Sequence, residues 1–288
     1  MYLTNKIGYI LAIATAFTYG FSGVLLKSVL DTGADTHTVL LFRVIIPIPF
    51  LVLVAKLRNQ SLFIGRVTSP TMGVLGFLLV LPWYFSIEAT SRLPVGTSTI
   101  IIYSFPLISI IALRLLFGVK ISKPTFFLSV GGFVGIYLLV GEHNNSLSSL
   151  GICLALLGAA SLSFYVIFLN QFAKELDSLI VTIHTLVFAT VAVFSFTLLT
   201  KPIGINFDSK TWVLLLGSSL LSALGMVCFL PMTRALGVSK ALVASNLQPI
   251  VTILLARIIL AETLSTVQIF AMIVILCSVF SLQFVQDQ

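Results

Sequence analysis

The polar residues best able to do chemistry in this sequence interrupt long apolar runs. Asn246 and Gln248 stand among Leu, Val, Ile and Ala residues, and a buried amide needs hydrogen-bond partners. At 1.5 Å per residue, both fall within about 10 Å of the middle of a helix that crosses a bilayer. Such residues either line a path for a polar solute or hold helices together. The same alternatives apply to Tyr19, Ser22, Tyr103, Ser104, Ser161 and Ser163. Trp83 and Tyr84 could instead belong to an interfacial aromatic belt, but their position just beyond Pro82 favours the cavity.

Prolines form a second group inside the apolar runs, and three of them lie close to these polar residues: Pro82, Pro106 and Pro249. A proline inside a helix lacks an N–H group and leaves a carbonyl without its helical partner. Within a membrane, such a carbonyl is tolerated where it faces protein or a wet cavity. Each proline could be a simple kink. We interpret Pro106 and Pro249 as hinges, because they recur in corresponding parts of the chain.

Four ionisable residues in or near the apolar runs are candidates for charge recognition or ion coupling. Arg43 lies about 10 Å inside the membrane if its helix starts near His37, where a charge is either functional or reaches back to the surface. His184 could pack through a hydrogen bond or carry a proton. Arg257 and Glu262 are five residues apart, so only a turn could pair them.

One short motif is compatible with a catalytic function. Gly20-Phe21-Ser22-Gly23 resembles the sequence around the nucleophile of rhomboid-type intramembrane proteases, and His184 could act as the base that a serine nucleophile requires. A short motif of this kind arises easily in a helix rich in Gly and Ser. The sequence contains no His/Cys ligand cluster and no phosphate-binding loop, so we expect neither a metal nor a cofactor.

The amino-acid composition indicates that membrane-crossing helices position these residues. Of 288 residues, 58% are apolar and only 9% are charged, against about 25% charged in soluble domains. This excludes a soluble globular protein and a nucleic-acid binder, despite a net charge of +7. Ten apolar segments are long enough to cross a bilayer as helices: 7–29, 37–55, 70–89, 94–117, 124–141, 149–170, 178–199, 211–232, 239–260 and 266–284.

Loop charges predict the orientation of these segments. The loops on the side of the N-terminus carry more Lys and Arg than the opposite loops, and an excess of positive charge marks the cytoplasmic side. We therefore expect both termini in the cytoplasm and the protein in the cytoplasmic (inner) membrane. We find no cleavable signal peptide pattern.

The sequence repeats itself at a shift of 143 positions. This shift aligns Gly8–Ala12 with residues 151–155, and Pro106 with Pro249. Arg114 aligns with Arg257 at the same shift. Five predicted helices fall in each half, and an odd number makes the second half enter the membrane from the opposite side. The pattern predicts two inverted repeats, residues 1–143 and 144–288, as in many secondary transporters.

These residues give the chain a family likeness. It resembles the ten-helix EamA-type members of the drug/metabolite transporter superfamily through residues 234–241, Gln248-Pro249-Ile250 and residues 260–265, and more loosely through Arg43, Thr90 and Pro106-Leu107. The family usually has a Gly-Glu pair near the end of the fourth or ninth helix. Glu262 retains the acid, whereas Val119 stands at the matching position. The resemblance implies transport of amino acids or other metabolites, often export.

We therefore expect an all-α integral membrane protein with ten transmembrane helices in two inverted five-helix repeats. It would be a secondary transporter that moves a small organic solute, an amino acid or related metabolite, by alternating access. None of the nine acidic residues is predicted at mid-membrane, so we expect a neutral, zwitterionic or anionic solute. Its partners would be that solute and the lipid bilayer, and a monomer would suffice. The alternatives are an intramembrane protease using Ser22 and His184, and a non-transporting scaffold or receptor.

Overall fold

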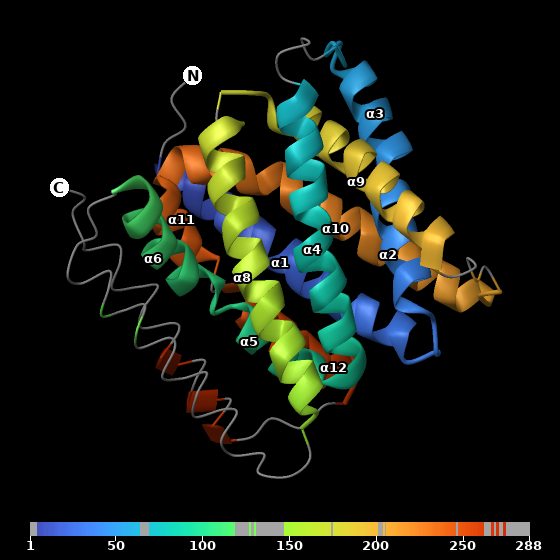
Figure 1. Ribbon diagram of the computed structural model, residues 1–288. Coiled ribbons are helices and arrows are strands. Elements are labelled where there is room, and N and C mark those ends of the chain that lie inside the picture. Colours follow the sequence, from blue (N-terminus) through green and yellow to red (C-terminus); the bar gives the residue numbers. More distant parts are fainter. Residues whose placement is uncertain are drawn as a thin grey trace.

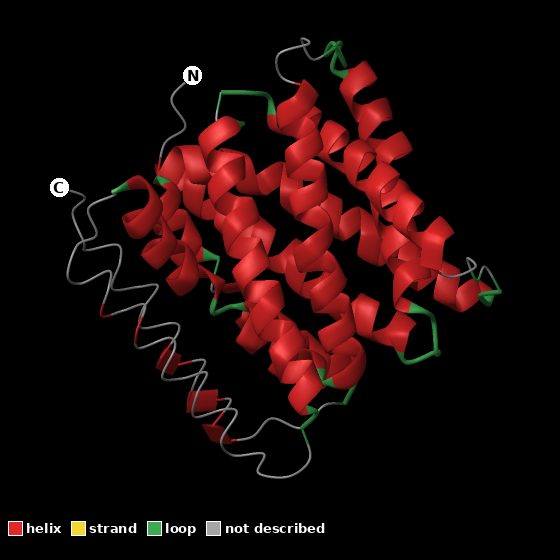
Figure 2. Cartoon of the chain, in the orientation of Figure 1, coloured by secondary structure: helices red, strands yellow, loops and turns green. Residues whose placement is uncertain are grey.

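In the part of the chain that the structure describes, all regular secondary structure is helical, and loops join the helices (Figure 2). The structure is a computed structural model, and it describes residues 5–63, 69–118, 127, 130, 147–173, 175–200, 204, 206–245, 247–261, 266, 267, 269, 270, 273 and 274. The helices are α1 (Asn5–Leu30), α2 (Thr36–Ile45), α3 (Pro47–Leu57), α4 (Ser69–Arg92), α5 (Val95–Ile102), α6 (Phe105–Phe117), α8 (Ser149–Phe172), α9 (Ser178–Thr200), α10 (Ser209–Leu236), α11 (Val238–Ala244) and α12 (Leu247–Ile259).

Eight helical segments among the described residues are long and apolar enough to cross a membrane. They match eight of the ten predicted segments to within a few residues at each end. The other two, 124–141 and 266–284, lie almost entirely outside the described residues. The all-helical membrane fold is therefore confirmed, and the count of ten stays a prediction.

Polar side chains cap the N-termini of four of these helices. Asp35 accepts hydrogen bonds from the backbone N–H groups of His37 and Thr38 at the start of α2. Ser148, Asp177 and Asp208 serve α8, α9 and α10 in the same way. These side chains satisfy N–H groups that have no partner within the helix. Three acidic residues are thus placed at helix starts, away from the middle of the bundle.

Three of the membrane-crossing segments are each built from two helices. One segment changes from α2 to α3 at Pro47, another from α5 to α6 at Tyr103 and Ser104, and the third from α11 to α12 just after Ser245. Pro47 and Pro106 lie in the first turns of α3 and α6, where the missing N–H group costs nothing. Pro82, by contrast, lies inside the continuous helix α4.

Close contacts between small and large residues join helices from the two halves of the chain. A Cβ atom added at Gly8 of α1 would lie 2.6 Å from Leu236 of α10, and one added at Gly151 of α8 would lie 2.8 Å from Leu93, just beyond α4. Residues 8 and 151 are 143 positions apart, as are residues 93 and 236. Figure 1 shows α4 and α8 side by side in front of α1 and α10.

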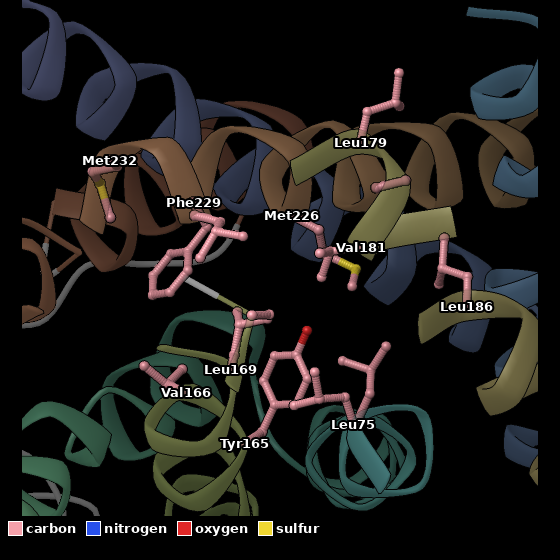
Figure 3. Packing of buried hydrophobic residues seen from close by; sticks show 14 of the residues in the cluster. Leu75, Tyr165, Val166, Leu169, Leu179, Val181, Leu186, Met226, Phe229 and Met232 are labelled. Carbon is pink, nitrogen blue, oxygen red and sulfur yellow. The ribbon is translucent and has the colours of Figure 1, made fainter. Parts of the chain in front are cut away.

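The largest apolar core lies between α4, α8, α9 and α10. Figure 3 shows part of it, with Leu75, Tyr165, Leu186 and Met226 directed toward a shared interior. Other large apolar side chains, including that of Leu199, face outward and are exposed. In a protein that crosses a bilayer, outward apolar side chains contact lipid and leave the interior free for polar groups.

The contact between α4 and α9 gives a first testable prediction. A Cβ atom at Gly76 would lie 2.5 Å from the Phe188 Cβ atom and 2.8 Å from the Ala189 backbone nitrogen, so the two helices must separate. We expect Gly76→Ala to lower the free energy of unfolding by about 1–3 kcal/mol. Denaturation of the purified protein in detergent measures it.

Gly73→Ala is the matched control, because it lies one turn earlier in α4. Its Cβ atom would lie 3.8 Å from the Phe188 ring, an ordinary contact, and alanine favours a helix over glycine by about 1 kcal/mol. Gly73→Ala should therefore leave stability unchanged or raise it. Equal losses for the two variants would show that the approach of α4 to α9 does not require Gly76.

Candidate functional site

A cavity of about 150 Å³ lies within the bundle and is lined from both halves of the chain. Its volume accommodates several water molecules or one small organic solute. Apolar residues such as Leu79, Val95 and Phe229 make up much of its wall. The polar and aromatic groups on the wall are Thr15, Tyr19, Arg43, Trp83, Ser86, Thr90, Thr99, Tyr103, Tyr165, Ser245 and Gln248.

The charged group on this wall is the guanidinium of Arg43, which is 8% exposed. Its Nη1 donates to the Ser218 hydroxyl and its Nη2 to the Ser22 hydroxyl, both at 3.1 Å. The guanidinium carbon lies 5.0 Å from the ring centroid of Trp83, a separation at which a cation is attracted to an aromatic face. Arg43 is thus held inside the protein and does not reach the membrane surface.

Two serines hold Arg43 where α1 packs against α10. The Ser22 hydroxyl donates to the Ser218 carbonyl at 2.8 Å, and the Ser218 hydroxyl donates to the Ser22 carbonyl at 3.0 Å. This reciprocal pair joins the two helices and presents both hydroxyl oxygens to the arginine of α2. Ser22 therefore does not line the cavity itself but positions a residue that does.

Arg43 has no carboxylate partner among the residues that the structure describes. The two ion pairs found there join Lys27 to Asp31 at 2.9 Å and Arg92 to Glu88. Both lie at helix ends. The Nε atom of Arg43 is buried, and no described residue accepts a hydrogen bond from it. A positive charge therefore borders the cavity with its hydrogen-bonding capacity only partly used.

A second polar contact joins two of the helix breaks. The hydroxyl of Tyr103, at the break between α5 and α6, donates to Oε1 of Gln248 in the first turn of α12. Both residues line the cavity. Asn246, the other amide predicted at the site, lies outside the described residues.

Several predicted site residues lie away from the cavity wall. Tyr84 packs against the His37 ring with 5.5 Å between centroids. The Ser161 hydroxyl bonds the Leu157 carbonyl of its own helix, and the Ser163 hydroxyl reaches the Phe105 carbonyl of α6. The remaining three, Ser104, Pro106 and Pro249, are buried and do not line the cavity, whereas Pro82 does.

Three ionisable candidates also lie apart from the cavity or outside the described residues. His184 is half-buried, and its Nδ1 donates to the Ile180 carbonyl one turn back in α9 at 2.9 Å. Arg257 is exposed in α12. Glu262 lies outside the described residues, so its pairing with Arg257 stays a prediction.

Sequence analysis missed several wall residues, and helical spacing would have revealed some of them. Thr15 lies one turn before Tyr19 in α1, and Ser86 and Thr90 lie one and two turns after Pro82 in α4. Residues four apart share one face of a helix, so each wall residue points to the next. Tyr165 lies one turn after Ser161, a predicted site residue whose own hydroxyl bonds within its helix.

Three aromatic rings separate this cavity from a smaller one. Tyr19, Tyr165 and Phe229 line both the main cavity and a second cavity of about 20 Å³, which extends to Ser178 at the start of α9. Tyr165 and Phe229 are labelled in Figure 3. The rings thus form a partition within the bundle.

Comparison with known proteins identifies the family. Residues 6–141 and residues 149–283 each match the EamA-like transporter family, and these matches begin 143 positions apart. The chain belongs to this family and is a multi-pass membrane protein. No curated protein matches it in sequence.

A solved structure supports the same fold. It is described only as the crystal structure of a protein, and it superposes with a TM-score of 0.68 at 15% sequence identity. The superposition covers 92% of this chain and 96% of the other. At this identity the likeness concerns the fold alone.

The serine pair gives a second prediction. Ser218→Ala removes one of the two hydroxyl groups that accept from Arg43, and a charged group that loses a buried partner costs about 1–3 kcal/mol. We expect a matching fall in the free energy of unfolding, measured by denaturation in detergent.

Ser219→Ala is the control for this prediction. Ser219 is equally buried in α10, but its hydroxyl donates only to the Leu215 carbonyl of its own helix. Its loss should cost less than about 1 kcal/mol, since no charged partner is left behind. A larger loss for Ser219→Ala than for Ser218→Ala would contradict the role given to the serine pair.

Proposed function

We propose that the protein is a secondary transporter that moves a small organic solute, an amino acid or related metabolite, across the cytoplasmic membrane. The observation that carries this proposal is the cavity, whose wall combines hydroxyl, amide and guanidinium groups inside an apolar helix bundle. Polar groups are costly inside a membrane protein and mark substrate paths. Membership of the EamA-like transporter family supports the same conclusion.

We further propose that ten helices form two inverted repeats, residues 1–143 and 144–288, which rock about the cavity by alternating access. Three observations support this arrangement: the two family matches, the paired contacts of Gly8 and Gly151, and the α5/α6 and α11/α12 breaks, which fall at nearly corresponding positions of the two halves. The break at Pro47 has no counterpart, because α9 is continuous. Broken helices at the interface of repeats are typical of solute sites in secondary transporters. Pro106 and Pro249 would then act as hinges beside the breaks.

The partition between the two cavities suggests how one side closes. Tyr19 comes from α1, Tyr165 from α8 and Phe229 from α10, so the three rings belong to both proposed repeats. A movement of α1 and α10 together away from α8 would part these rings and connect the solute cavity to the side of Ser178. The moving unit would then combine helices of both repeats. We propose that these rings are the closed gate of the present conformation.

The two alternative functions find less support in the geometry. An intramembrane protease needs a base bonded to its serine, but the Ser22 hydroxyl contacts Ser218 and Arg43, and His184 bonds within its own helix. A scaffold or receptor has no need of a cavity lined by polar groups at helix breaks. Transport accounts for both features.

We propose that flux follows the solute gradient without obligatory proton exchange. None of the described residues that line the cavity is acidic, so a solute that is neutral, zwitterionic or anionic fits better than a cation. His184 and Glu262 remain the candidates for coupling. Uphill uptake into proteoliposomes under an imposed pH gradient, abolished by His184→Ala or Glu262→Gln, would overturn this part of the proposal.

A loss-of-transport variant tests the main proposal. Gln248→Leu removes the acceptor of Tyr103 and a polar group from the cavity wall. A lost hydrogen bond in a desolvated site is worth about 1–3 kcal/mol, so we expect flux to fall about 10-fold or more. A metabolite panel in proteoliposomes first identifies the transported solute, and its flux is then compared between variants.

The control is Asn170→Leu, which removes another buried amide. The Asn170 side chain donates to the Val166 carbonyl of its own helix and does not line the cavity. It should retain flux at equal yield of folded protein. Normal flux through the Gln248→Leu variant would remove Gln248 from the path, and no flux of any solute through the native protein would overturn the transport proposal.

The proposed orientation, with both termini cytoplasmic, gives a separate prediction. Thr32 follows α1 and Ser61 follows α3, and both are exposed. One membrane-crossing segment separates them, so we expect them on opposite sides of the membrane. With the native cysteines replaced by serine, an impermeant thiol reagent should label Thr32→Cys in intact cells. It should label Ser61→Cys only after the cells are opened. The reverse pattern would invert the orientation and leave the fold untouched.

A further inference from the structure

We infer that Arg43 is the anchor for a carboxylate group of the solute, so that the protein binds small organic acids, with or without an amino group. This inference rests on the proposed function and narrows it to one chemical class. It also replaces a role for Arg43 in ion coupling with a role in solute recognition.

The guanidinium is held in place but is not saturated. Of its five N–H groups, one donates to Ser22 and one to Ser218. The Nε–H has no described partner although it is buried, and no carboxylate lies within ion-pair distance among the described residues. A planar guanidinium binds a carboxylate through two parallel hydrogen bonds. Because Nε itself is buried away from open space, a carboxylate that enters from the cavity beside Arg43 would bond the N–H groups of Nη1 and Nη2 that Ser22 and Ser218 do not use.

The fold itself does not require an arginine at this position. The residue 143 positions later is Leu186, which is 0% exposed. The counterparts of Ser22 and Ser218 at the same shift are Tyr165 and Leu75. Leu186, Tyr165 and Leu75 all belong to the apolar core shown in Figure 3. One half of the chain thus fills this place with two leucines and a tyrosine, whereas the other half places a supported cation beside a cavity.

The other wall residues indicate which chemical groups the rest of the solute can have. The rings of Tyr19, Trp83 and Tyr103 line the cavity, and aromatic surfaces favour an apolar body. Among the described wall residues, an ammonium group would meet hydroxyl and amide acceptors but no carboxylate. We therefore propose that the carboxylate is required for binding and that the amino group is tolerated but not required.

A fluorescence titration tests this requirement directly. The sequence has two tryptophans, and Trp212→Phe leaves Trp83, which stacks on Arg43, as the single indole reporter. Four probes share one branched carbon skeleton and differ in two groups: isocaproate, leucine, isocaproamide and leucinamide. Isocaproate and leucine carry the carboxylate, whereas leucine and leucinamide carry the ammonium. Each is titrated into the purified Trp212→Phe protein in detergent.

We expect isocaproate and leucine to bind at least about 10-fold more tightly than the two amides, because a charge-assisted bidentate contact is lost in the amides. Arg43→Leu, which copies the residue found at position 186, should abolish this preference. Arg43→Lys keeps the charge without the planar fork and should retain a reduced preference. This second variant keeps the test valid if Arg43→Leu fails to fold.

Three results would overturn the inference: amides that bind as tightly as carboxylates, a carboxylate preference that survives Arg43→Leu, or no response of Trp83 to either carboxylate. Flux of the same four probes into proteoliposomes is measured in parallel. Flux of isocaproamide without any carboxylate preference would refute the role of Arg43 and leave the transport proposal standing. The absence of flux for these probes and for the wider metabolite panel would instead refute transport.

Discussion

A positive charge that has no carboxylate partner among the described residues lies inside a bundle of apolar helices, and much of the surrounding structure serves to hold it there. Removing a charged group from water costs several kcal/mol unless other groups compensate. Arg43 is compensated by two hydroxyl oxygens and one indole ring. The hydroxyls are available because Ser22 and Ser218 pair across the contact of α1 with α10. The position of the cation therefore depends on the packing of these two helices.

The contact of α1 with α10 depends in turn on small residues along both helices. Gly8 faces Leu236, and Gly225 faces the Tyr19 ring, where an added Cβ atom would lie 2.9 Å from three ring atoms. Glycine at these points allows the helices to approach closely enough for backbone and hydroxyl groups to bond. It also leaves room for Tyr19, a residue that lines both cavities. The polar interior is thus a consequence of close helix packing.

Two of the helix breaks place irregular backbone in the middle of membrane-crossing segments, beside the cavity. Helix α5 ends just before Tyr103 and Ser104, and α6 begins after them at Phe105, with Pro106 in its first turn. The hydroxyl of Tyr103 then bonds Gln248, beside the second break. Irregular backbone at membrane depth is tolerated where it faces protein or a wet cavity, and both breaks border the cavity.

The sequence by itself determined the helical membrane fold, because composition and the length of apolar runs leave no other way to satisfy the backbone in lipid. It also pointed to Tyr19, Arg43, Trp83, Tyr103 and Gln248, since polar residues in apolar runs are conspicuous. Only the tertiary structure decided that Ser22 supports Arg43 while Ser161 bonds within its own helix. Both are serines in apolar helices, and periodicity cannot tell which neighbour each will meet. That choice, like the wall position of Tyr165, depends on contacts between helices far apart in sequence, which are set by packing and not by local pattern.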